Sequence, residues 1–128
     1  MTWSFSQRSE RYLANIHPDL AKVVRLALQI SAVDFVVIDG LRTLETQQAL
    51  VAAGASQTMN SRHLTGHAVD IAPWINRSIP WKDWQAFALV AQAMKQAAQD
   101  LNIPLIWGGD WKTLKDGPHF ELSREAYP

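Results

Sequence analysis

Residues 61–73, SRHLTGHAVDIAP, constrain the fold more strongly than any other stretch of the chain. Gly66 stands between two histidines, where glycine disfavours an α-helix by about 1 kcal/mol relative to alanine. The following side chains alternate, so that Asp70 points to one face while Val69 and Ile71 point to the other. A proline then ends the run. The stretch therefore predicts a turn at Gly66 that leads into a short strand.

The two histidines of this stretch permit two interpretations. On a helix, His63 and His67 would share one face, as in the HExxH zinc motif. Leu64 occupies the position of that motif's glutamate, and Gly66 breaks the helix, so we reject this interpretation. A chain that reverses at Gly66 could instead bring His63 beside Asp70, which the spacing neither demands nor forbids. His67 is then expected to point away from Asp70, toward the surface or behind the site.

A third candidate ligand lies near the C-terminus. The chain has no cysteine, so a metal site would use imidazole and carboxylate ligands. Zinc often takes three such ligands and leaves a fourth position for water. His119 could join His63 and Asp70, and Asp116, across a Gly-Pro turn, could contact that water. Each residue also has an ordinary interpretation, as a surface histidine, a turn-forming aspartate or a strand-end carboxylate. Spacing alone does not decide between a metal site and those roles.

The remaining pattern predicts one α+β domain that spans residues 1–128. We expect a short helix within residues 6–16, and longer helices over 18–30, 43–53 and 82–101. Residues 35–38, 68–73 and 103–107 are expected to be strands, with a further short strand after a turn at 116–118. The first and third of these strands are interpreted as buried. His17, at a helix start, is interpreted as structural, and most of the six tryptophans as core residues.

Charge and hydropathy exclude several classes of function. Twelve basic residues balance twelve acidic ones, so no overall field draws the protein to nucleic acid or to an anionic membrane. No segment is long and apolar enough to span a bilayer, and the N-terminal residues lack an apolar run of signal-peptide length. We therefore expect a soluble chain made in the cytoplasm, with no nucleic-acid partner and no stable membrane insertion.

Four segments together resemble a family of zinc peptidases that act on bacterial cell walls. Residues 61–70, SRHLTGHAVD, resemble its S-x-H-x-x-G-x-A-x-D signature, and residues 40–47, GLRTLETQ, resemble its G-x-R-[ST] segment with a following glutamine. Residues 107–111, WGGDW, and 116–121, DGPHFE, resemble the region of its last ligand. The family includes D-alanyl-D-alanine carboxypeptidases and dipeptidases and phage L-alanyl-D-glutamate endopeptidases, and its fold is related to the hedgehog domain. The resemblance implies a short, mostly antiparallel sheet that carries a zinc site and is flanked by helices.

The resemblance also implies a role for each matching residue. The ligands of a single zinc ion match His63, Asp70 and His119. Asp116 matches the catalytic carboxylate, and Arg42 matches the arginine that faces the substrate carbonyl or carboxylate. Ser61 and Gln47 match positions near the substrate cleft. In the implied mechanism, Asp116 takes a proton from the water that zinc activates and passes it to the leaving amine. Arg42 helps zinc to stabilise the oxyanion.

The N-terminal stretch FSQRSERYLANIHPDLAKVVRLAL resembles the start of the phage endopeptidase branch. We therefore expect a phage endolysin, a monomeric zinc-dependent peptidase that cuts the L-Ala–D-Glu bond of peptidoglycan stem peptides during host lysis. Made in the host cytoplasm without a signal peptide of its own, it would reach the periplasm after a holin opens the membrane. The alternatives are a D-alanyl-D-alanine carboxypeptidase or dipeptidase of the same family, and a zinc-binding module without catalysis. The intact Asp116 argues against the last of these.

Overall fold

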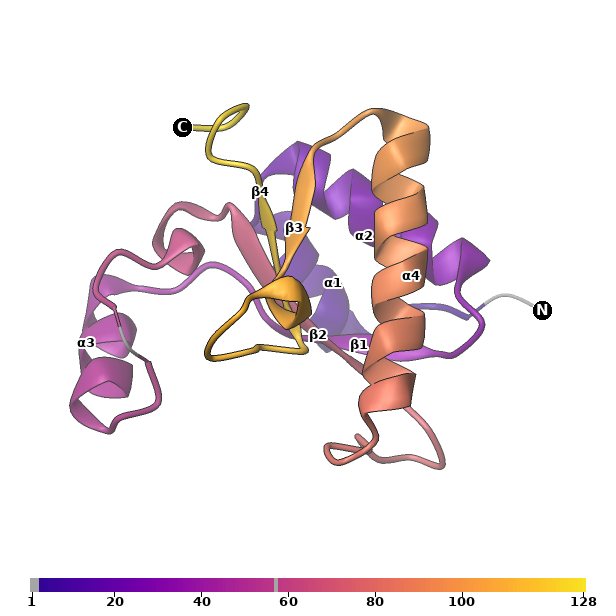
Figure 1. Cartoon of the computed structure of the whole chain (residues 1–128), viewed down its shortest axis with the longest axis horizontal. Helices are drawn as coiled ribbons and strands as arrows, with labels where there is room; N and C mark the ends of the chain where they lie inside the picture. The colour runs from indigo at the N-terminus through magenta and orange to yellow at the C-terminus, as the bar shows by residue number, and fades with distance from the viewer. Residues whose placement is uncertain (1–2, 57) are drawn as a thin grey trace.

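The computed structural model of the chain describes residues 3–56 and 58–128. Figure 1 shows how the helices and strands are arranged. In chain order the elements are α1 (Gln7–Ala14), α2 (Pro18–Ile30), β1 (Phe35–Asp39), α3 (Leu44–Ala52), the 3-10 turn η1 (Arg62–Thr65), β2 (Ala68–Pro73), α4 (Trp84–Leu101), β3 (Leu105–Trp107), the 3-10 turn η2 (Gly108–Asp110) and β4 (His119–Leu122). The α+β class expected from the sequence is confirmed.

The described strands form one antiparallel sheet in the order β1-β2-β4-β3. β2 and β4 are therefore neighbours in its centre, although about 45 residues separate them in the sequence. Each central strand is hydrogen-bonded on both sides, which fixes its register and the direction of its side chains. The antiparallel sheet expected from the resemblance is confirmed.

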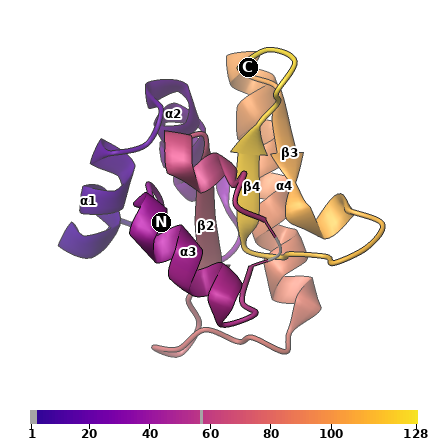
Figure 2. The same ribbon diagram turned by 90° about the vertical axis from the view of Figure 1, so that its left-hand side faces the viewer.

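Helices α1, α2 and α4 cover one face of this sheet, with α2 packed against α4 and α1 against β1 (Figure 1). Val69, Ile71 and Phe120 project from the central strands into this core, and all three are fully buried. Because side chains alternate along a strand, Asp70 and His119 project from the other face. Figure 2 shows α3 in front of the sheet and α4 behind it. The polar face of the central strands thus lies on the side of α3.

Polar residues fix the starts of the helices. The residues that cap α1, α3 and α4 through a side-chain oxygen are Ser6, Thr43 and Asp83. Pro18 begins α2, and Nδ1 of His17 accepts a hydrogen bond from the N–H of Asp19 at 3.1 Å. His17 is therefore a helix cap, as expected. Helix α4 begins two residues later than expected because Asp83 acts as its cap.

The prediction that residues 35–38 and 103–107 are buried strands is wrong in part. Both segments form strands, but β1 and β3 are the two edges of the sheet. In β3, which begins only at Leu105, Ile106 is 37% exposed while Trp107 is buried. A short apolar run does not distinguish a central strand from an edge strand that a helix covers on one face.

The expectation that most tryptophans are core residues is also wrong. Trp107 is buried, whereas Trp74, Trp81 and Trp84 are between 38% and 61% exposed. The exposed rings of Trp81 and Trp84 stack on the more buried rings of Phe87 and Trp107, at centroid distances of 6.0 and 5.6 Å. Large aromatic side chains can therefore gain packing area on one face while the other face remains in water.

None of the helices within residues 3–56 and 58–128 has the length and hydropathy that a bilayer span requires.

Candidate metal centre and catalytic cleft

Two of the three candidate ligands form a cross-strand pair on the polar face of the sheet. Asp70 of β2 and His119 of β4 are direct partners in the antiparallel register. Both side chains therefore project from the same face, and Oδ1 of Asp70 lies 3.4 Å from Nδ1 of His119. The strand geometry alone thus brings together two residues that are 49 positions apart in the sequence.

His63 reaches the same point from η1. Ser61 caps this turn by accepting a hydrogen bond from the N–H of His63 at 3.2 Å. Gly66 ends it with a φ of 76°, in the left-handed region that favours glycine. The chain then reverses into β2, and Nε2 of His63 lies 3.2 Å from Oδ1 of Asp70. The rejection of an α-helix here is correct, since His63 lies in a single 3-10 turn rather than in a loop or a continuing helix.

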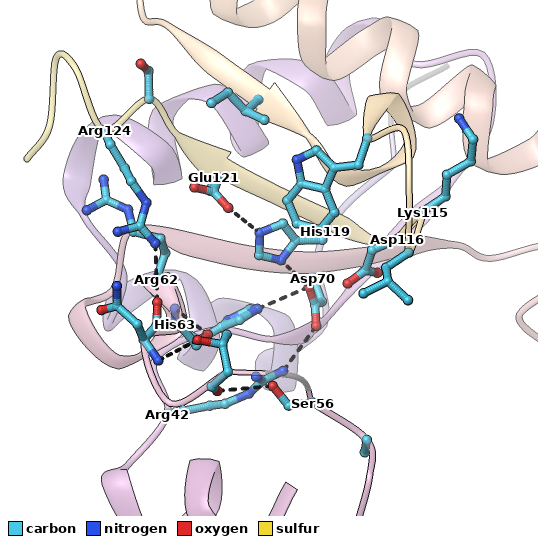
Figure 3. A pocket seen from close by; sticks show the side chains of 18 of the residues that line it. Arg42, Ser56, Arg62, His63, Asp70, Lys115, Asp116, His119, Glu121 and Arg124 are labelled. Atoms are coloured by element: carbon cyan, nitrogen blue, oxygen red, sulfur yellow. Dashed lines mark hydrogen bonds and ion pairs between the residues drawn. The ribbon is translucent and has the colours of Figure 1, made fainter. Parts of the chain in front are cut away.

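Each histidine is held by a hydrogen bond on the ring nitrogen that faces away from Asp70. Nδ1 of His63 lies 2.8 Å from the carbonyl oxygen of Gly40, and Nε2 of His119 lies 2.8 Å from a carboxylate oxygen of Glu121. Because both acceptors lack a proton, these two nitrogens carry the hydrogens. Nε2 of His63 and Nδ1 of His119 face Asp70 (Figure 3), and in neutral imidazoles these are the nitrogens with a free lone pair.

Three ligand atoms, one each from His63, Asp70 and His119, lie within 4.8 Å of one another. Two neutral imidazoles and a carboxylate form the donor set that zinc commonly takes in catalytic sites, with a further position open. The second ring nitrogen of each histidine is already hydrogen-bonded, as is usual for metal-ligating histidines. The residues present therefore fit a divalent metal ion.

The charges of the cluster are strongly coupled. Burial by itself would raise the pKa of Asp70, but hydrogen bonds from His119 and His63 hold that pKa well below its usual range. Burial would lower the pKa of His119, yet the bonds to Asp70 and Glu121 raise it to about 9. A protonated His119 thus balances the two carboxylates in the metal-free protein. A bound cation would take over this role.

Asp116 lies beside the cluster on the turn that leads into β4. Its backbone N–H donates to the carbonyl oxygen of Gly108 at 3.1 Å, and its carbonyl oxygen accepts from the N–H of His119 at 3.2 Å. Burial and, after it, the negative charge of Asp70 raise the pKa of Asp116. A half-buried carboxyl group with a raised pKa next to a metal site is suited to exchanging protons with a reacting group.

Arg42 approaches Asp70 from the side of α3. Its guanidinium donates to Oδ2 of Asp39 at 2.7 Å, to Oε1 of Gln47 at 3.0 Å and to Oδ2 of Asp70 at 3.5 Å. These contacts fix a largely buried positive charge at the edge of the cluster. The sequence interpretation and the structure thus agree that Arg42 stands at this site.

Gln47 is buried behind the cleft, whereas Ser61 lines it. Gln47 is 0% exposed, and its amide donates to Oγ of Ser56 at 2.9 Å and to the carbonyl oxygen of Thr58 at 2.7 Å. It therefore supports Arg42, Ser56 and Thr58 from within, rather than presenting a surface to the cleft. Gln57, part of the predicted loop 55–63, lies outside the described residues. Ser61 lines the cleft itself.

The cluster lies at the bottom of a cleft with a volume of about 780 Å³. Besides Arg42 and Asp70, the lining residues come from two parts of the chain. They are Ala55, Ser56, Thr58, Asn60, Ser61, Arg62 and His63 from the first part, and Ile106, Trp111, Leu114, Lys115, Asp116, His119, Glu121, Ser123, Arg124 and Glu125 from the second. Trp111 lies over His119 with a ring-centroid distance of 5.1 Å. Six of the seven site residues predicted from the sequence line this cleft, and the seventh, Gln47, lies behind it. The six are Arg42, Ser61, His63, Asp70, Asp116 and His119.

His67 lies outside the cluster, as expected. Its ring packs against His17 at 5.4 Å between centroids, and Nδ1 lies 2.6 Å from Oγ1 of Thr65. Glu121 is the residue at the site that the sequence interpretation missed. It stands two positions after His119 in a strand, a spacing that places both side chains on one face. That spacing is the signal that could have identified it.

Comparisons with known proteins agree with this geometry. Residues 1–125 match the family described as phage L-alanyl-D-glutamate peptidase. The chain is 40% identical to the L-alanyl-D-glutamate peptidase of Escherichia phage T5, over 99% of this chain and 94% of that protein.

Two solved structures are also similar. The structure of the Serratia marcescens L-Ala D-Glu endopeptidase ChiX superposes with a TM-score of 0.90 at 50% identity, over 97% of this chain and 92% of that one. The D,D-dipeptidase VanXYg shares the fold at a TM-score of 0.54 and 19% identity, over 84% of this chain and 50% of that one. With the family match across residues 1–125, these findings show that the chain belongs to the phage L-alanyl-D-glutamate peptidase family.

Proposed function

We propose that the protein is a zinc-dependent endopeptidase that hydrolyses the L-Ala–D-Glu bond of peptidoglycan stem peptides. The observation that carries the proposal is the convergence of His63, Asp70 and His119 beside Asp116 in one cleft. Family membership supports the choice of bond, because relatives that match most of this chain are named for that activity.

The metal would be held by Nε2 of His63, a carboxylate oxygen of Asp70 and Nδ1 of His119. A bound zinc ion supplies Lewis acidity, which activates water and polarises the scissile carbonyl. These ligands come from a strand pair and a capped turn that are hydrogen-bonded to one another, so they require little rearrangement to bind the ion.

Asp116 acts as the general base and then as the general acid. Its carboxylate accepts a proton from the attacking water and returns it to the amine of D-glutamate as the peptide bond breaks. Its raised pKa, which burial causes, brings it closer to neutral pH and so favours both directions of transfer. Aspartate is shorter than glutamate, and the hydrogen bonds of its backbone to Gly108 and His119 hold it near the cluster.

Arg42 stabilises negative charge on the substrate. Its guanidinium is fixed by Asp39 and Gln47 before substrate arrives, so little reorganisation is needed when charge develops on the carbonyl oxygen. Ser61 lines the cleft, which supports a role for it in contacting the substrate. Gln47 acts through Arg42.

The other candidate of the same family is a D-alanyl-D-alanine carboxypeptidase or dipeptidase. The two activities differ in product, so digestion of purified peptidoglycan separates them. The endopeptidase yields peptides with a new amino-terminal D-glutamate, whereas the alternative releases D-alanine. Free D-alanine without new D-glutamate termini would overturn the proposal. A zinc-binding module without catalysis would give neither product.

The proposal extends to host lysis. We place synthesis in the host cytoplasm, release to the periplasm through a holin, and action as a monomer on the cell wall. The relationship to a phage enzyme supports this sequence of events. Expression in the bacterial cytoplasm with and without a holin tests it, since lysis should require the holin. Light scattering on the purified protein gives the oligomeric state.

A further inference from the structure

Glu121 is a buried carboxylate that the proposed chemistry leaves without a role. It is 8% exposed, although charged side chains are seldom buried unless they are paired. Its partner is a metal-ligand candidate, because Oε1 of Glu121 lies 2.8 Å from Nε2 of His119. The carboxylate is thus on the opposite side of the imidazole from Asp70 (Figure 3).

The backbone holds Glu121 in this position from both sides. Within β4 it pairs with Ala68 of β2 and with Ile106 of β3. His119 and Glu121 are two residues apart on the same strand, so their side chains lie next to each other on the cleft face. Arg62 donates to the carbonyl oxygen of Leu122 at 3.3 Å, which fixes the strand directly after Glu121.

The two histidines differ in what supports them. A neutral backbone carbonyl accepts the hydrogen bond from His63, whereas a carboxylate accepts the one from His119. A charged acceptor forms a stronger hydrogen bond and makes the imidazole a better electron donor to a metal. It also opposes a ring flip that would turn Nε2 instead of Nδ1 toward Asp70.

We propose that Glu121 is a positioning residue of the metal centre, which holds the proton of His119 on Nε2 and thereby directs Nδ1 to the metal and strengthens metal binding. This inference rests on the proposed function, since it requires that the cluster binds a metal. It assigns no contact with substrate to Glu121.

Zinc affinity measured by chelator competition tests this role without any activity assay. We expect E121A to bind zinc roughly 10- to 100-fold more weakly than the wild type, the usual range for loss of such a partner. E121Q retains a hydrogen-bond acceptor without the charge and should lie between the two. E125Q removes a carboxylate that lines the same cleft but is not among the side-chain hydrogen-bond or ion-pair partners of His119, which in the described part of the chain are Asp70 and Glu121, and its zinc affinity should be unchanged. Equal zinc affinity of E121A and the wild type would overturn the role.

A purely structural role is distinguished by unfolding experiments with and without zinc. If Glu121 acts on the metal, E121A loses more stability in the zinc-loaded protein than in the metal-free protein. Equal losses in the two states would contradict the proposal. In nitrogen NMR spectra of the zinc-loaded wild type, His119 should be protonated at Nε2, with that proton exchanging faster in E121A.

These outcomes separate the inference from the proposed function. A wild-type protein that binds no zinc would overturn both. If the wild type and E121A bind zinc equally tightly, and the wild type still cleaves L-Ala–D-Glu bonds, only the role of Glu121 would be overturned.

Discussion

His63 and His119 lie with their ring centroids 5.2 Å apart and offer different nitrogen atoms to the same carboxylate oxygen of Asp70. His63 presents Nε2, and His119 presents Nδ1. This asymmetry follows from the hydrogen bonds behind the two rings, since one ring is held by the backbone carbonyl group of Gly40 and the other by the carboxylate of Glu121. It leads to specific expectations for protons, metal and catalysis.

Metal binding should release a proton at neutral pH. The pKa of His119 in the metal-free protein is raised to about 9, so its ring is protonated at pH 7 and must lose that proton to bind zinc. Calorimetry in buffers with different ionisation enthalpies should therefore show release of about one proton per zinc ion at pH 7. A binding enthalpy that does not depend on the buffer would contradict this.

The same pKa sets how the stability of the metal-free protein depends on pH. The folded pKa of His119 lies above its unfolded value of about 6.5, so the stability it provides is complete below about pH 6.5. That contribution should be lost as the pH rises through about 9. Urea unfolding of the metal-free protein between pH 6 and 10 measures it, and a saturating zinc concentration should reduce the dependence.

Asp116→Asn should abolish most of the activity without removing the metal. Loss of a general acid–base group costs roughly 10²- to 10⁴-fold in rate, while the ligand set remains intact. The initial rate on purified peptidoglycan and the zinc content of the same preparation test this. Asp110→Asn is the matched control, because its exposed side chain forms an ion pair with Lys95. Full lytic activity of Asp116→Asn would contradict the assigned mechanism.

Gly108 should not tolerate a side chain. A Cβ atom at this position would lie 2.5 Å from the carbonyl oxygen of Asp116 and 3.1 Å from Cβ of His119. Gly108→Ala must therefore displace the turn that carries both residues, and we expect weaker zinc binding and a large loss of rate. Gly54→Ala is a useful comparison, since a Cβ there meets no atom within 4 Å and its positive φ affects only local stability. Wild-type rate and affinity in Gly108→Ala would show that the turn is not constrained in this way.

Gln47→Leu should separate support of the site from metal binding. Leucine fills a similar volume but leaves Arg42 Nη1 and the carbonyl group of Thr58 without their partner, at a cost of about 1–3 kcal/mol per buried group. We expect lower stability and a lower kcat with unchanged zinc content, because Gln47 contacts none of the ligands. Gln96→Leu, at an exposed position of α4, controls for the substitution itself. Loss of zinc from Gln47→Leu would argue for a different role.

The sequence pattern was sufficient for those features that depend on local rules. Gly66 and the alternation after it predict the turn and the strand, which permit His63 to approach Asp70 without requiring it. The pairing of Asp70 with His119 could not be derived in this way, because it depends on β2 and β4 becoming neighbours across an intervening helix. Only the family resemblance supplied that connection.

Other features were not predictable because they depend on tertiary packing. Glu121 looks like any polar residue of a short strand until its register against β2 and β3 is known. The family resemblance predicts Gln47 near the substrate cleft, whereas its amide is buried between Arg42 and Thr58. The exposed rings of Trp81 and Trp84 depend on where α4 begins, which hydrophobicity alone does not determine.

A crystal structure of the zinc-loaded protein, with the ion identified by anomalous diffraction, would show which side chains bind the metal. We expect one zinc ion bound by Nε2 of His63, a carboxylate oxygen of Asp70 and Nδ1 of His119, each at about 2.0–2.2 Å. Zinc bound instead through His67, or directly through Glu121 in place of His119, would contradict it.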